Sequence, residues 1–242
     1  MTTFCESPGG ATIPHLWVCY ALIPMARHGK HKIRGILFDW DGTLLNSYAA
    51  DSAAYLAMFQ EMGIAWGLEE LDRHYSPNWY DVYRAAGIHE SRWNAADLSW
   101  RAQYANHKSQ LISGARSLLA ALRKKYPLGL VTSGDRDRVT RQLREFRLLR
   151  TFAARVCGGD TVNKKPHPEP LRKALRAMQL IAQDCVYVGD TREDIHMARS
   201  AGVRTIGVMG PFPTAHTLKL SRPDLLLSSL RELPQALRTL QP

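Results

Sequence analysis

Short apolar runs recur along most of the chain and alternate with stretches of helical period. The first run spans residues 33–38, and later runs span residues 128–132, 155–157, 185–188, 204–209 and 225–227. Between them, apolar residues spaced three and four apart predict helices over residues 113–125, 135–149, 168–180 and 191–201. Strands that alternate with helices predict an α/β fold, a Rossmann-like parallel sheet with helices on both faces.

The stretch between the first two strands has a different pattern. Residues 47–110 contain no continuous apolar run, and Tyr55, Met58, Phe59 and Met62 follow helical spacing. We therefore expect an all-helical cap domain at residues 47–112, inserted into a core made of residues 33–46 and 113–242. An insertion at this point lies at the carboxyl edge of the sheet, where open α/β folds bind ligands, so it is well placed to act as a lid.

The N-terminal extension, residues 1–32, precedes this pattern. Its apolar stretch, roughly residues 15–26, is too short to span a bilayer, and no positive charge precedes it as in a secretory signal. We expect the extension to be dispensable, with translation starting at Met25, and we expect no membrane partner.

Composition narrows the range of partners. The 242 residues carry a formal net charge of +10, and the densest arginines, over residues 136–150, are interpreted as a solvated helix face. No nucleic-acid motif accompanies them, so no nucleic-acid partner is expected. Four cysteines without C-x-x-C spacing suit a reducing compartment and a cytoplasmic protein, and Cys157 and Cys185 are expected in the core.

The sharpest chemical signal directly follows the first strand, in the sequence DWDGTL. Asp39 and Asp41 are two residues apart, so in an extended segment their carboxylates face the same way. Gly42 permits a turn there. An isolated D-x-D pair is common in turns, and the EF-hand alternative fails because the glycine and glutamate of that loop are missing.

Three further polar groups follow later strands. They are VTSG at residues 131–134, KKPHPEP at residues 164–170, and VGDTREDIHMA at residues 188–198. Taken singly, each is an ordinary turn, basic loop or helix cap. Together they bring carboxylates, a hydroxyl and a lysine to one sheet edge, where Mg²⁺ would join the carboxylates and help neutralise a phosphoryl group.

This set of four motifs resembles the haloacid dehalogenase superfamily, and more closely its phosphoglycolate phosphatase-like branch with a helical cap. The resemblance implies a phosphoric monoester hydrolase that uses Mg²⁺. It makes Asp39 the nucleophile that forms an aspartyl-phosphate, and Asp41 the acid and base. Asp41 also argues for phosphoryl transfer over carbon–halogen cleavage, because the superfamily's dehalogenases lack a carboxylate there.

The resemblance also implies roles for the remaining motif residues. Thr132 and Lys165 would bind the phosphoryl oxygens as catalytic residues. Asp190 would ligate the metal with Asp39 and the backbone carbonyl of Asp41, and Asp194 would support the metal site. The residues that would complete the phosphate-binding loops are Gly42, Thr43, Ser133 and Gly134.

Substrate choice is expected to depend on the cap. The segment RHYSPNWY, residues 73–80, resembles a loop between cap helices, and Arg73, His74 and Asn78 are candidates to face the substrate. The partner implied is a small phosphorylated metabolite, with phosphoglycolate first, for a monomer or homodimer. A phosphomutase similar to beta-phosphoglucomutase and a non-enzymatic binding module remain alternatives, since the motifs do not determine how the cap excludes water.

Overall fold

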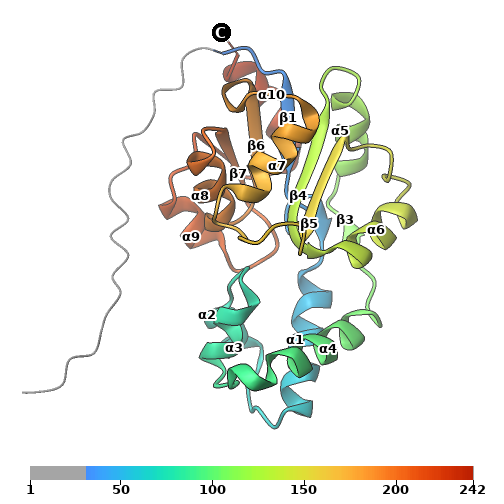
Figure 1. The fold of residues 1–242 in the computed structure, drawn as a ribbon, viewed down its shortest axis with the longest axis vertical. Helices are drawn as coiled ribbons and strands as arrows, with labels where there is room; N and C mark the ends of the chain where they lie inside the picture. Colours follow the sequence, from blue (N-terminus) through green and yellow to red (C-terminus); the bar gives the residue numbers. More distant parts are fainter. Residues whose placement is uncertain (1–30, 242) are drawn as a thin grey trace, which may run out of the picture.

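The fold is organised around a six-stranded parallel sheet. The computed structural model describes residues 31–241, and the prediction about a start at Met25 lies outside them. The strands run in the order β5-β4-β1-β6-β7-β8 (Figure 1). Their bounds are β1 Gly35–Phe38, β4 Leu128–Asp135, β5 Ala154–Gly158, β6 Cys185–Gly189, β7 Arg204–Val208 and β8 Leu225–Leu227. All neighbouring pairs are parallel, and the central strand β1 lies between β4 and β6.

Helices cover both faces of this sheet. One face carries α5 (Ala115–Leu122), α6 (Arg136–Glu145) and α10 (Leu233–Thr239), whose apolar side chains share a core cluster with β1 and β4. The other face carries α7 (Glu169–Met178) and α8 (Arg192–Ser200), which pack in a second cluster. The short helix α9 (Ala215–Leu220) follows β7 and packs beside α8. The prediction of a Rossmann-like α/β fold is thus confirmed.

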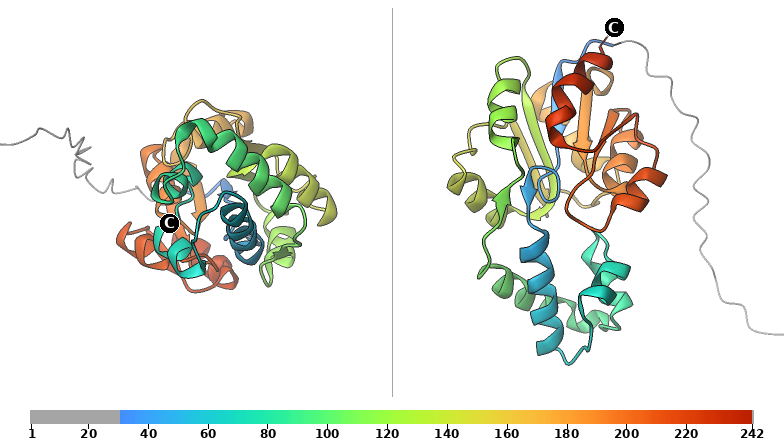
Figure 2. Two further views of the ribbon diagram at one scale, coloured as in Figure 1. Left: turned by 90° about the horizontal axis from the view of Figure 1, so that it is seen from below. Right: turned by 180° about the vertical axis from the view of Figure 1, so that it is seen from behind.

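A helical cap follows the first strand. It consists of α1 (Tyr48–Glu61), α2 (Leu68–His74), α3 (Trp79–Ala85), the single turn η1 (Glu90–Arg92) and α4 (Trp93–Tyr104). These helices lie together beyond one end of the sheet in Figure 1, and Figure 2 shows the same separation from behind. Their shared core is largely aromatic, because Tyr55, Phe59 and Tyr83 pack with the surrounding tryptophans.

The two chain segments that join cap and core pair with each other. Strand β2 (Leu45–Asn46) enters the cap and β3 (Gln110–Leu111) leaves it, and they form a two-stranded antiparallel sheet. No prediction covered β2, β3, α9 or α10. The first three are too short for a periodic signal, whereas Leu233, Leu237 and Leu240 in and after α10 do follow helical spacing. No helix among residues 31–241 has the length and apolarity needed to cross a membrane.

Candidate active site

The four motifs converge on one cavity between the sheet edge and the cap. Asp39 follows β1, Thr132 lies near the end of β4, Lys165 lies in the loop after β5, and Asp190 follows β6. Parallel strands place their carboxyl ends on one edge, which is why residues far apart in sequence meet here. The cavity has a volume of about 360 Å³ and is lined by all four residues together with cap side chains.

Lys165 joins two of the carboxylates. Its Nζ donates to Asp39 Oδ1 at 2.6 Å and to Asp194 Oδ1 at 2.7 Å, and all three side chains are buried. Asp194 is held in turn by Tyr187 and by the Thr191 hydroxyl at the start of α8. The lysine is therefore fixed beside the nucleophile candidate, as the prediction for a phosphate-binding cation requires.

A group of three carboxylates offers a metal site. One oxygen each from Asp39, Asp190 and Asp194 lies within 4.8 Å of the others. Asp190 Oδ1 accepts a hydrogen bond from Thr43, whereas its Oδ2 is buried without a partner among the described residues. An orphaned buried carboxylate oxygen costs free energy unless a cation or donor reaches it, so the group fits Mg²⁺.

Gly42 is required by this geometry. Its φ is +81°, and a Cβ atom there would lie 2.1 Å from Asp190 Oδ2. A side chain at this position would displace the Asp190 carboxylate of the candidate metal site.

The pKa values reflect the crowding of charge. Burial, together with the neighbouring Asp194 and Asp41 charges, outweighs the attraction of Lys165 and raises the pKa of Asp39 to about 7. Burial and the charges of Asp39 and Asp194 raise the pKa of Asp190 well above its ordinary value. A divalent cation would reverse both shifts, because it stabilises the ionised carboxylates.

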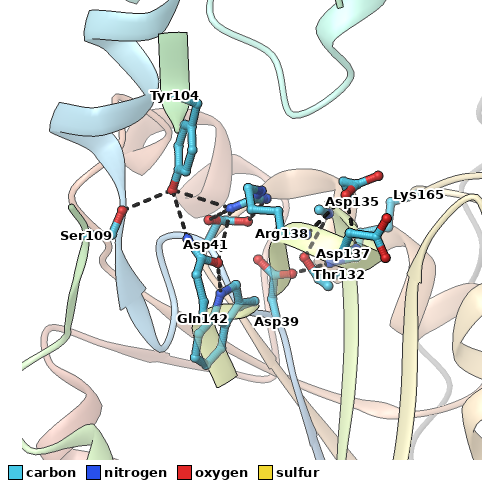
Figure 3. A network of polar contacts seen from close by, with 12 residues as sticks. Asp39, Asp41, Tyr104, Ser109, Thr132, Asp135, Asp137, Arg138, Gln142 and Lys165 are labelled. Carbon is cyan, nitrogen blue, oxygen red and sulfur yellow. Dashed lines mark hydrogen bonds and ion pairs between the residues drawn. The ribbon is translucent and has the colours of Figure 1, made fainter. Parts of the chain in front are cut away.

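Asp41 occupies a different environment, shown in Figure 3. Arg138, from α6, donates from both terminal nitrogens to its two oxygens, at 2.9 Å and 2.7 Å. Burial acts to raise the pKa of Asp41, but the pairing with Arg138 dominates and lowers it. The Tyr104 ring and hydroxyl, from the last turn of cap helix α4, and Gln142 hold the guanidinium in turn. The carboxylate is thus ionised and oriented by a residue that contacts the cap.

The second motif supplies hydroxyl and amide groups at the same edge. Thr132 is buried, and its hydroxyl accepts a hydrogen bond from the Gly134 backbone N–H at 3.0 Å. Thr132, Ser133 and Gly134 all line the cavity. A Cβ atom on Gly134 would lie 2.3 Å from Arg138, so glycine leaves room for the arginine.

The three cap candidates are placed elsewhere. Arg73 pairs with Glu69 on the surface, His74 stacks on Trp66, and the Asn78 amide donates to Asp81. None of the three lines the cavity. Their neighbours Tyr75, Ser76, Pro77, Trp79 and Tyr80 line it instead, so the predicted segment reaches the site through other side chains.

Sequence reasoning missed Arg138, Asp51, Arg101 and Lys164, which all line the cavity. The interpretation of residues 136–150 as a solvated helix face is wrong for Arg138, whose side chain is only 11% exposed. Helical periodicity identifies a face of a helix, but it does not show that the cap residue Tyr104 and the carboxylate of Asp41 both contact one arginine of that run. Cys157 and Cys185 are buried, as predicted.

Comparisons with known proteins identify the family of the chain. The model of the haloacid dehalogenase-like hydrolase family matches residues 36–208. The phosphoglycolate phosphatase of Yersinia pseudotuberculosis is 30% identical over 216 residues, covering 85% of this chain and 93% of its own. That of Escherichia coli is 28% identical over 233 residues, covering 85% and 92%.

Solved structures give the same result for the fold. CbbY from Rhodobacter sphaeroides, in complex with phosphate, superposes with a TM-score of 0.68 at 26% identity, covering 83% of this chain and 96% of that one. A haloacid dehalogenase-like family protein from Streptococcus pneumoniae superposes with a TM-score of 0.75 at 22% identity, covering 84% and 98%. With its four motifs gathered at one sheet edge beneath a helical cap, this chain belongs to the haloacid dehalogenase-like hydrolases.

Proposed function

We propose that this protein is a phosphatase that hydrolyses a small phosphomonoester with Mg²⁺ through an aspartyl-phosphate on Asp39. The observation that supports this most is the contact between Asp39 and Lys165 at the base of the cavity, next to the orphaned Asp190 oxygen. A nucleophile beside a fixed cation and a metal-binding group is the arrangement that phosphoryl transfer needs. Phosphoglycolate, the substrate in the names of the curated relatives, is the reference ester for this activity.

The first half of the reaction forms the covalent intermediate. An oxygen of Asp39 attacks phosphorus while the bond from phosphorus to the ester oxygen breaks. Lys165 balances charge on the phosphoryl oxygens, and Thr132 and the amides that follow it contact the same group. Asp41, carrying a proton, gives it to the departing alcohol oxygen.

The second half regenerates the enzyme. Asp41, now ionised, takes a proton from water as the water oxygen attacks phosphorus, and the bond to Asp39 breaks to release inorganic phosphate. The bidentate contact with Arg138 holds Asp41 in this ionised state, which is the form that a base requires. Protonation of Asp41 for the first half therefore requires that this contact loosen.

Mg²⁺ would be held by Asp39, Asp190 and the backbone carbonyl of Asp41, with Asp194 supporting the site. When bound, it would neutralise charge on the transferring phosphoryl group and align it with Asp39. Lys165 and Thr43 orient the two ligand carboxylates from the protein side.

The test measures phosphate release from a panel of esters, including phosphoglycolate, with and without Mg²⁺. We expect release that requires Mg²⁺ and is lost in Asp39→Asn, with trapped phosphate appearing on Asp39 in the wild type after rapid acid quench. Asp81→Asn, which changes an exposed cap aspartate paired with Arg84, is the matched control. Release that survives Asp39→Asn would contradict the proposal.

A further inference from the structure

The basic side chains that line the cavity all have partners. Lys165 binds Asp39 and Asp194, Arg138 binds both oxygens of Asp41, and Arg101 lies 3.2 Å from Asp135. Lys164 lies over the Trp79 ring at 3.8 Å and the Tyr80 ring at 4.7 Å. Among residues 31–241, no lining lysine or arginine outside the phosphate site is left without such a contact to receive a second anion of the substrate.

One acidic side chain of the cavity, by contrast, has no partner among the described residues. Asp51, from the first turn of α1, lines the cavity, and its carboxyl group makes no hydrogen bond or ion pair with any described residue. The other lining carboxylates outside the metal group are engaged: Asp41 by Arg138, Asp97 by the Tyr83 hydroxyl and Asp135 by Arg101. Asp51 is thus the unpaired acid of the described part of the cavity.

The surroundings of Asp51 are poor in counter-charge. Burial, with a contribution from Asp41, outweighs the attraction of Arg138 and raises the pKa of Asp51 to about 8. Carboxyl groups in such places are stabilised in the ionised form when a cation arrives. No described lysine or arginine forms an ion pair with Asp51, so such a cation would have to come with the ligand.

Several aromatic rings also line this cavity. Tyr55 and Trp100 pack together at 6.1 Å between ring centroids, and Tyr75 packs on Phe212 of the core at 5.1 Å. All four line the cavity with Asp51. Aromatic faces attract alkylammonium groups, and Lys164 on Trp79 and Tyr80 shows that rings of this cavity hold an ammonium.

We propose that the substrate is a phosphate ester of an amino alcohol, whose ammonium group pairs with Asp51 among the aromatic side chains while its phosphoryl group meets Asp39. This rests on the proposed function, and it narrows the substrate class. A substrate carboxylate such as that of phosphoglycolate would face unpaired Asp51, and the Arg138 guanidinium is already bound by Asp41. Because the pKa of Asp51 is raised to about 8, such a carboxylate gains no counter-charge there below that pH, and above it the two like charges weaken binding.

Binding of non-hydrolysable phosphonates tests the inference without turnover. Aminoethylphosphonate, propylphosphonate and phosphonopropionate share one arm and end in an ammonium, a methyl and a carboxylate group. Binding is measured by calorimetry with the full-length protein and Mg²⁺. The ammonium compound should bind at least about tenfold more tightly than the methyl compound, because it alone makes a charge-assisted contact with Asp51. The carboxylate compound should bind most weakly.

Two variants assign the effect to Asp51. Asp51→Asn keeps the shape of the side chain but removes its charge. In this variant the affinities of the ammonium and methyl compounds should differ by no more than about threefold. Glu90→Gln removes an exposed acid from the same cap, outside the cavity, and should keep the wild-type order. In the wild type, kcat/KM should decrease from aminoethyl phosphate to propyl phosphate to phosphoglycolate. The ratios of kcat/KM between these esters are compared from one variant to another, because the leaving-group reactivity of each ester is the same in every variant.

The outcomes separate the two proposals. Equal binding of the ammonium and methyl compounds, tighter binding of the carboxylate compound, no binding of any, or an unchanged order in Asp51→Asn would overturn the amino-alcohol assignment. If phosphoglycolate were preferred and Lys164→Met abolished that preference, Lys164 would be the receiving cation and the assignment would be wrong. The compounds could bind in the expected order while no ester releases phosphate with Mg²⁺. That result would support the ammonium site and refute the proposed phosphatase activity.

Discussion

Replacing Arg138 with methionine should destabilise the fold through the carboxylate it leaves behind. Methionine replaces the apolar stem of the arginine side chain but lacks its charge. It therefore removes both hydrogen bonds to Asp41, which measure 2.9 Å and 2.7 Å. The Arg138 and Asp41 side chains are 11% and 23% exposed, so water screens the pair only in part. The variant therefore leaves a largely buried carboxylate without its counter-ion.

The size of the loss can be bounded. Removing one member of a buried ion pair typically costs about 3–5 kcal/mol. Asp41 can limit the loss by taking up a proton, and its partial exposure admits some water, so we expect the free energy of unfolding to fall by about 3 kcal/mol at neutral pH. The Asp41→Asn/Arg138→Met double variant leaves neither charge unpaired, and it should lose about 2 kcal/mol less than the sum of the single variants.

Urea denaturation without Mg²⁺, followed by tryptophan fluorescence, measures these free energies. The pH dependence gives a second check. In the wild type the pKa of Asp41 is lower in the folded protein than its value of 3.8 in the unfolded chain. Asp41 therefore contributes its full stabilisation of the fold above pH 3.8, and this contribution is lost as the pH falls through the folded-state pKa. In Arg138→Met this pKa rises, so the deficit relative to the wild type should shrink as pH is lowered from 7 towards about 4.

Two results would refute this reasoning. One is a stability of Arg138→Met within about 0.5 kcal/mol of the wild type, which is the range of ordinary surface substitutions. The other is simple additivity in the double variant, which would mean that the two side chains do not interact in solution.

Three further changes probe the metal site and the cavity. In differential scanning fluorimetry, Mg²⁺ should raise the melting temperature of the wild type by relieving repulsion among the carboxylates of Asp39, Asp190 and Asp194. Asp190→Asn should abolish this rise. An unchanged rise in the variant would mean that the ion binds elsewhere. Gly42→Ala should also lose the shift, whereas Gly63→Ala, which has a similar φ of +75° but no atom within 4 Å of the added Cβ, should keep it. Asp51→Asn should stabilise the ligand-free protein. Because the pKa of Asp51 is raised from 3.8 to about 8, the destabilisation it causes accumulates between those pH values, and thermal melts should show the gain growing over that interval and levelling off above it.

The core sheet was predictable because its signals are local. Each buried parallel strand is a short apolar run, and the predicted runs match β1, β4, β5, β6, β7 and β8 within a few residues. The short pair β2 and β3 and the helix α9 were not predicted, since a few residues carry no measurable period. Helix α10 was missed although Leu233, Leu237 and Leu240 follow helical spacing.

That the candidate site residues gather at one edge was also predictable, for a topological reason. Once the strands are parallel, the residues that follow them must share one edge, and Asp39, Thr132, Lys165 and Asp190 all line the same cavity. That meeting depends only on strand direction and on position in the chain, both of which the sequence carries.

What the sequence alone did not determine is which side chains the cap brings to this edge. Arg73, His74 and Asn78 have suitable chemistry but point to partners within the cap. Asp51 and Arg138 meet the cavity because α1, α4 and α6 dock in one particular orientation. Helical periodicity describes each helix by itself, whereas which arginine and which acid reach the cavity depends on packing between segments far apart in the chain. Only the tertiary structure decides that.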